Sequence, residues 1–212
     1  VEKDMGIQSV FHFHADPRSK NLKRWIFDPG YSSENKRLKK LFLELIELGH
    51  EIGLHPGFDS WNNKEEMYRQ KQLLEISSKT KVAVCRQHWL RFSWEKTWAI
   101  QESVGLESDT TLMFNDRPGF RNSSAVAWHP WNVSSQTAHG LTARTTVLMD
   151  SHLYDYQLMT LKQRAEQVTS WLAETQSVHG DNSFLWHAHT LTKDYGWREG
   201  FVYLLSSINK LK

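Results

Sequence analysis

Helix-like and strand-like patterns of apolar residues alternate along most of the chain. The clearest helix begins after Ser33, the expected N-cap, and places Leu38, Phe42 and Leu45 on one apolar face. Gly49 is expected to end that helix, and a short apolar strand follows at once. A helix with an apolar face followed by a buried strand is the repeating unit of an α/β protein.

The same alternation continues on both sides of this unit. We expect a polar loop from about residue 15 to 33. Strands are expected at 7–14, 50–55, 82–86, 107–112, 145–150 and 183–187, and further helices at about 62–78, 94–104, 160–177 and 197–211. This order predicts an α/β fold with a mostly parallel sheet, and a distorted (β/α) barrel is favoured over an open doubly wound sheet.

Residues 113–144 interrupt this rhythm. They are rich in Asn, Ser, Gly and Pro and contain Trp128, His129 and Trp131. Long segments without a pattern are usually functional or mobile. We therefore expect one domain, residues 1–212, with a long loop insertion at about 113–144.

Composition excludes several classes of function. The net charge is +2 with both signs spread along the chain, which gives no support for nucleic-acid or anionic-membrane binding. The sequence has no apolar run of membrane-spanning length and no signal-peptide pattern. The single Cys85 excludes an internal disulfide, and a cytoplasmic location is expected. The 11 His and 10 Trp residues suit metal binding, proton transfer and stacking on sugars.

Four predicted strands end on residues that bind metals or move protons. These are His14 with Asp16, His55 with Asp59, Arg86 with His88, and His187 with His189. Strand ends of such a fold meet at one rim, where imidazoles and carboxylates form the ligand set of zinc or a similar divalent ion. The ordinary alternative for each is a loop, turn or packing residue, and for His14 and Asp59 the two readings are evenly balanced.

Three motifs resemble those of the polysaccharide deacetylases, the NodB-homology carbohydrate esterases. Residues 49–55 (Gly-His-Glu-Ile-Gly-Leu-His) resemble the second motif, and residues 184–187 (Phe-Leu-Trp-His) resemble the last. Residues 86–93 (Arg-Gln-His-Trp-Leu-Arg-Phe-Ser), with 109–112 and 117–121 after them, resemble an uncharacterised branch of this family. The resemblance covers nearly the whole chain in the right order.

The resemblance implies a distorted barrel of βα units and a divalent metal, usually zinc, held by one Asp and two His. It also implies a second Asp as general base, an Arg that orients this base, and a His that protonates the leaving group. Carried over by position, His55 is a metal ligand, Arg86 the orienting residue and His187 the acid.

The chain departs from the family pattern at two places. Asp59 occupies the position of the second zinc histidine, so either Asp59 ligates through oxygen or His88 supplies the nitrogen. The first motif, a strand with two aspartates, is absent, and Asp16 comes one strand too late to replace it. We expect that the first βα unit is missing, in a fragment or a degenerate homologue.

These observations predict metal-dependent deacetylation of an acetylated sugar or polysaccharide. Trp89, Asp109 and Trp186, which lie in or beside these motifs, are the expected substrate-binding residues. The alternative is a non-catalytic carbohydrate-binding or scaffold homologue that has lost the aspartate pair. A phosphoesterase ranks last, because no Lys and Arg cluster for a phosphate is present. The expected partners are a carbohydrate and, because strand edges at 7–14 and 183–187 would be exposed, a second copy in a homo-oligomer.

Overall fold

The computed structural model describes residues 1–15 and 22–211, and Asp16 lies outside them. Two compact units make up the chain. One contains Gln8–Thr111 and Trp128–Ala143 and is called the five-stranded unit here. The other contains Val1–Ile7, Leu112–Ala127 and Arg144–Lys212 and is called the two-stranded unit. None of the described helices is both long enough and apolar enough to cross a membrane.

A parallel sheet forms the centre of the five-stranded unit. Its strands lie in the order β1 (Val10–Phe13), β2 (Glu51–Leu54), β3 (Val84–Cys85), β4 (Ser108–Asp109) and β7 (Thr142–Ala143). Every pair in this order is parallel. An α/β fold with a mostly parallel central sheet is therefore confirmed. In the part of the chain that the structure describes, no strand pairing closes this sheet into a barrel.

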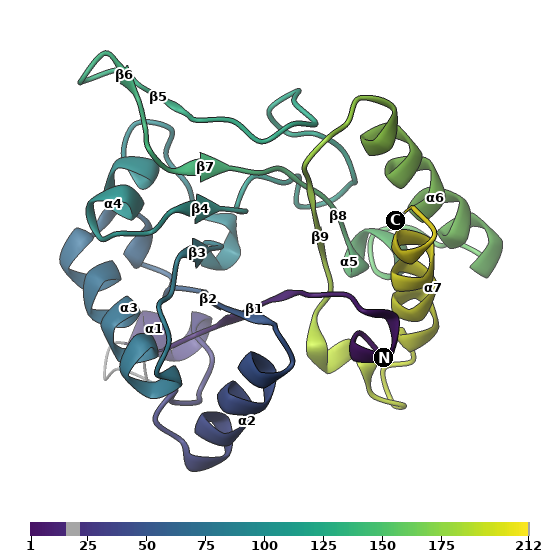
Figure 1. The fold of residues 1–212 in the computed structure, drawn as a ribbon, viewed down its shortest axis with the longest axis horizontal. Helices are drawn as coiled ribbons and strands as arrows, with labels where there is room; N and C mark the ends of the chain where they lie inside the picture. The colour runs from purple at the N-terminus through teal and green to yellow at the C-terminus, as the bar shows by residue number, and fades with distance from the viewer. Residues whose placement is uncertain (16–21, 212) are drawn as a thin grey trace. The chain divides into compact units, whose positions relative to one another are not determined.

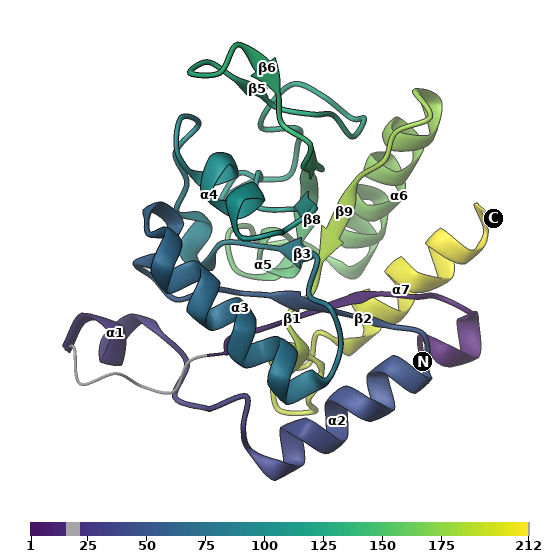
Figure 2. The same ribbon diagram turned by 60° about the vertical axis from the view of Figure 1, so that its left-hand side comes forward.

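Helices with an apolar face cover this sheet. The unit contains α1 (Leu22–Phe27), α2 (Lys36–Glu47), α3 (Lys64–Ser78) and α4 (Thr97–Ser103). Figures 1 and 2 show α2 and α3 beside the sheet, and Phe42 of α2 packs edge-on against Phe13 of β1. Burial of the Phe42 ring removes apolar surface from water and stabilises this packing.

The start of α2 differs from the expectation. Asn35 is the N-cap, and its side chain accepts a hydrogen bond from the Arg37 amide. The prediction of Ser33 as N-cap is wrong, because its buried hydroxyl donates to the Ala15 carbonyl and contacts the Ser77 hydroxyl. Asn63 is the N-cap of α3, and its side chain accepts a hydrogen bond from the Glu66 amide.

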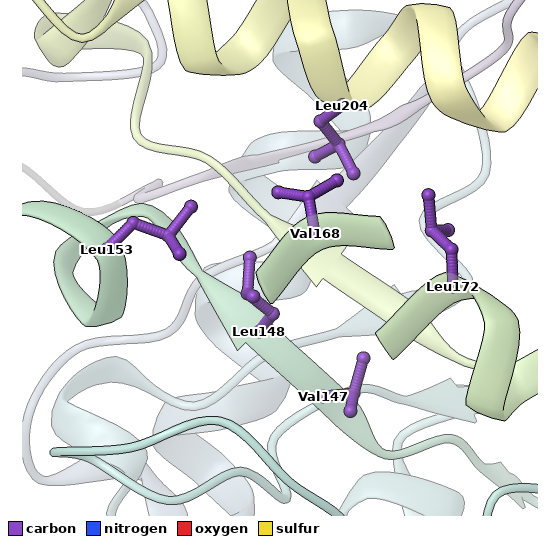
Figure 3. Packing of buried hydrophobic residues seen from close by; sticks show 6 residues of the cluster. All are labelled: Val147, Leu148, Leu153, Val168, Leu172 and Leu204. Atoms are coloured by element: carbon purple, nitrogen blue, oxygen red, sulfur yellow. The ribbon is translucent and has the colours of Figure 1, made fainter. Parts of the chain in front are cut away.

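The two-stranded unit is built on β8 (Thr146–Met149) and β9 (Ser183–Leu185), which are parallel. Its helices are α5 (Asp150–Tyr154), α6 (Leu161–Ser177) and α7 (Arg198–Asn209). Figure 3 shows the core of this unit, where Leu204 of α7 points toward Val168 of α6. The other buried members of this core are Val147, Leu148, Leu153 and Leu172.

Residues 113–144 are more structured than the sequence predicted. They contain β7 and an antiparallel pair formed by β5 (Trp131–Asn132) and β6 (Thr137–Ala138). Within this segment, residues 113–127 belong to the two-stranded unit, and Trp128–Ala143 belong to the five-stranded unit. The structure also contains short helical turns at Lys3–Met5, Ser60–Asn62, His88–Leu90 and Ala188–Leu191.

Candidate functional site

The carboxyl ends of β1, β2 and β3 carry His14, His55 and Arg86 side by side. Strand register explains this, because Phe13 pairs with Leu54, and Leu54 pairs with Cys85. His88 follows two residues after Arg86 in a helical turn. The expectation that distant strand-end residues meet at one edge thus holds within the five-stranded unit.

His55 and His88 contact each other through their ring nitrogens. The Nε2 atom of His55 lies 2.8 Å from Nδ1 of His88, and the two rings meet edge-on. His55 Nδ1 donates to the Arg86 carbonyl at 2.7 Å, and His88 Nε2 donates to the Phe27 carbonyl at 2.6 Å. A carbonyl only accepts, so both outer nitrogens carry hydrogen, and a ring that is neutral therefore has a lone pair on its inner nitrogen.

The surroundings keep both rings neutral. Burial, together with the nearby His88 ring, lowers the pKa of His55 to about 3. Burial also lowers the pKa of His88, against the opposing effects of the bond to Phe27 and the charge of Asp28. Two nitrogens without hydrogen repel each other at this distance, and a cation bound by both of them would relieve that repulsion.

His14 and Asp28 support this pair. His14 Nδ1 donates to the His55 carbonyl at 3.3 Å, and burial lowers the pKa of His14. The buried Asp28 carboxylate accepts from the Phe58 amide and Arg24 Nε, and lies 3.9 Å from His88 Nε2. Asp28 was missed by sequence reasoning, because it lies in the segment expected to be a polar loop.

The pair fits a divalent ion as two nitrogen ligands. Each imidazole is oriented by a bond from its other nitrogen to a carbonyl, as is usual for metal-binding histidines. Among residues 1–15 and 22–211, no three His, Cys, Asp or Glu side chains gather as a metal-binding group. Asp59, the other predicted ligand, accepts from Lys23 at 2.9 Å and Arg91 at 3.0 Å.

Arg86 and Asp109 are both buried next to this edge of the sheet. Arg86 Nε donates to the Thr110 carbonyl, and burial lowers the pKa of Arg86 to about 10, although the charge of Asp109 opposes this shift. Asp109 accepts from Gln101, Trp98 and Thr111. Burial raises the pKa of Asp109 against the effect of these donors. The carboxylate predicted to bind substrate thus faces donors within the protein.

Trp89 presents an exposed ring beside the histidine pair. Trp89 is 62% exposed. Its indole nitrogen donates a hydrogen bond to the Phe27 carbonyl, which also accepts one from His88. Trp89 and Leu90 both have positive φ angles, of 56° and 52°. Such angles are strained for bulky residues and are often found at functional sites.

A second arrangement of functional side chains lies in the two-stranded unit. Met149 of β8 pairs with Leu185 of β9, which places Asp150 and His187 together just beyond the strand ends. Buried Asp150 accepts from His187 Nδ1 at 2.7 Å, from the His187 amide at 2.9 Å and from Thr190 Oγ1 at 3.1 Å. The His187 side chain is 42% exposed, so its Nε2 is the nitrogen that a substrate can reach.

Asp150 is charged in this arrangement. Burial alone would raise its pKa, but the hydrogen bonds from His187 and Thr190 outweigh burial and lower it. A carboxylate at Nδ1 fixes the tautomer of the imidazole and stabilises its protonated form. The sequence offered one signal for this residue, an apolar strand that ends on an acid, but nothing that paired it with His187.

Trp186, the remaining predicted substrate-binding residue, packs within the two-stranded unit. Its ring lies 6.1 Å from that of Tyr154 and 5.6 Å from that of Phe201. Its buried indole nitrogen has no hydrogen-bond partner among the described residues.

Comparison with known proteins informs the fold. No family model matches the chain, and no curated protein matches its sequence. The fold is similar to that in the crystal structure of a protein named "putative polysaccharide deacetylase" from Mycobacterium smegmatis, with a TM-score of 0.64 and 16% sequence identity. The match covers 99% of this chain and 67% of that one. At 16% identity the likeness shows the fold alone. It supports the resemblance to polysaccharide deacetylases at the level of the fold.

Proposed function

We propose that this protein removes acetyl groups from an acetylated carbohydrate by hydrolysis, with a divalent ion, zinc by expectation, held at His55 and His88. The observation that carries the proposal is the contact of His55 Nε2 with His88 Nδ1 at 2.8 Å, with the other nitrogen of each ring bonded to a backbone carbonyl. The fold-level likeness to a deacetylase supports the same class of reaction.

Hydrolysis joins a water oxygen to the acetyl carbon and breaks the bond from that carbon to the nitrogen or oxygen of the sugar. A divalent ion would supply Lewis acidity and make water more nucleophilic. His55 and His88 would hold it, oriented by the carbonyls of Arg86 and Phe27. Buried Arg86 would favour negative charge at this strand end.

His187 is the proposed proton donor. The departing amine or hydroxyl needs a proton, and the solvent-accessible Nε2 of His187 can give one when the ring is charged. Asp150 stabilises that charged ring through Nδ1. The exposed indole of Trp89 is the proposed stacking surface for a sugar ring.

Release of acetate from a panel of N- and O-acetylated oligosaccharides with added zinc or cobalt tests this proposal. We expect His88→Ala to lose zinc binding and activity together. His187→Ala should retain zinc and lose about 100-fold or more in kcat, the usual contribution of a general acid. His179→Asn is the matched control, because this exposed histidine has a φ of 50° that asparagine tolerates. An active His88→Ala variant with full zinc content contradicts the proposal.

Carbohydrate binding without catalysis is the second candidate. The exposed Trp89, whose indole nitrogen is hydrogen-bonded to Phe27, favours it, since a sugar-binding module needs such a ring but no metal. Oligosaccharide binding that Trp89→Ala abolishes, without any release of acetate in the presence of zinc, would identify this function.

A further inference from the structure

A row of aromatic rings extends from His187 along the surface of the two-stranded unit. The ring of His189 lies 5.6 Å from that of His187, and the ring of Tyr195 lies 5.2 Å from that of His189. Trp197 follows, 4.8 Å from Tyr195. Neither His189 nor Tyr195 takes part in the functions assigned above.

The far end of this row is anchored. Trp197 stacks on Tyr154 with ring centres 4.7 Å apart, and the Arg164 guanidinium lies 3.9 Å from the centre of the Tyr154 ring. The near end is anchored as well, since the buried Thr190 donates its hydroxyl hydrogen to Asp150 and the Trp197 amide donates to the Thr190 carbonyl. The loop that carries Tyr195 is thus closed at both ends.

Tyr195 remains open between these anchors. It is 46% exposed, although its ring contacts both His189 and Trp197 in near-perpendicular orientation. An exposed aromatic ring in a fixed orientation loses little entropy when a ligand packs on it. The carbon-bound hydrogens of a pyranose ring suit such a surface, and its hydroxyls suit the imidazole and phenol groups at the border.

We propose that Tyr195 and His189 form a stacking subsite for a pyranose ring that is part of the carbohydrate from which His187 assists release of the acetyl group. The inference rests on the proposed function, because it uses His187 as the proton donor. The row leads directly to this residue, in ring-to-ring steps of 5.2 and 5.6 Å. Tyr195 is thus a specificity-determining residue rather than a catalytic one.

Saturation-transfer NMR with mono- to tetrasaccharides of N-acetylglucosamine and N-acetylgalactosamine tests the subsite. We expect Tyr195→Ala to bind the preferred sugar about tenfold more weakly, as for loss of one good aromatic contact. Tyr195→Phe, which keeps the ring, should bind as the unmodified protein does. Tyr203→Ala is the matched control, because this tyrosine on α7 is 41% exposed and outside the row. Circular dichroism verifies that each variant is folded.

Acetate release separates this inference from the proposed function. The subsite predicts a raised KM with little change in kcat for Tyr195→Ala. Equal KM and equal binding for Tyr195→Ala and the unmodified protein overturn the subsite, even if acetate is released. The subsite is also overturned if the unmodified protein binds none of these sugars. Sugar binding that only Tyr195→Ala weakens, without acetate release by any variant, supports the subsite and refutes the deacetylase.

Discussion

Which nitrogen each imidazole leaves free determines what the candidate residues can do. His55 and His88 each give one N–H to a backbone carbonyl, which orients the ring without favouring its charged form strongly. His187 instead gives its Nδ1 hydrogen to the Asp150 carboxylate, which stabilises a charged ring. The first two histidines therefore suit a metal ion, and the third suits proton transfer.

Asp150→Asn tests the electrostatic part of this argument through stability. The buried carboxylate accepts hydrogen bonds from the His187 amide and the Thr190 hydroxyl, and the asparagine would place an NH2 group against one of these donors. We expect the free energy of unfolding to fall by about 1–3 kcal/mol near neutral pH. The pKa of Asp150 is lowered in the folded protein, so its contribution is full above the ordinary value of 3.8 and disappears as the pH falls through the lower folded value.

Urea unfolding of both proteins at several pH values measures this difference. It should shrink as the pH falls below about 4. Asp155→Asn, an exposed aspartate at the end of α5, should stay within about 0.5 kcal/mol of the unmodified protein at every pH. A loss for Asp150→Asn that does not vary with pH would mean that shape rather than charge is responsible.

The sequence identified the strand-end histidines but not the groups that form hydrogen bonds with them. His55 and His187 were predicted because apolar strands end on them, and His88 because a histidine was missing four residues after His55. The acceptor for His88 is a backbone carbonyl, at Phe27, and backbone groups leave no trace in a sequence. Asp59 has the predicted spacing, yet Lys23 and Arg91, remote in sequence, bind its carboxylate.

At the scale of elements, long amphipathic helices were predictable and very short strands were not. The helices α2, α3, α6 and α7 lie close to the predicted ranges, because each has an apolar face. The expected strands at 82–86 and 107–112 shrink to the two-residue β3 and β4. The length of such strands depends on pairing with neighbours rather than on local pattern. The same dependence explains why β5, β6 and β7 were missed.

The start of α6 makes a local prediction about stability. Thr160 Oγ1 accepts from the Gln163 amide at 3.3 Å, and Gln163 Oε1 accepts from the Thr160 amide at 2.8 Å, which completes a capping box. We expect Thr160→Ala to reduce the free energy of unfolding by about 1 kcal/mol in urea titrations. Glu166→Ala, on the exposed surface of the same helix, is the control and should change it by less than about 0.5 kcal/mol. Equal effects of the two variants would refute the capping role.

At the scale of the whole molecule, the two units carry different chemistry. The five-stranded unit contains the His55–His88 pair and the exposed Trp89, whereas the two-stranded unit contains Asp150, His187 and the row of rings that includes Tyr195. Each unit has its own buried apolar residues. A variant that removes a proposed metal ligand from one unit should therefore leave the proposed proton donor of the other intact, and a thermodynamic measurement can separate the two.

Zinc binding provides that measurement without reference to catalysis. An ion that binds only the folded protein stabilises it, by about 2.7 kcal/mol when free zinc is 100 times its dissociation constant. We expect a corresponding zinc-dependent rise in the midpoint of thermal unfolding, which is absent in His88→Ala because one of two nitrogen ligands is lost. His187→Ala should retain the full rise, since that imidazole is bound to Asp150 in the other unit. Calorimetry with and without a chelator would measure both. A rise that survives in His88→Ala, or that His187→Ala abolishes, would place the ion elsewhere than at His55 and His88.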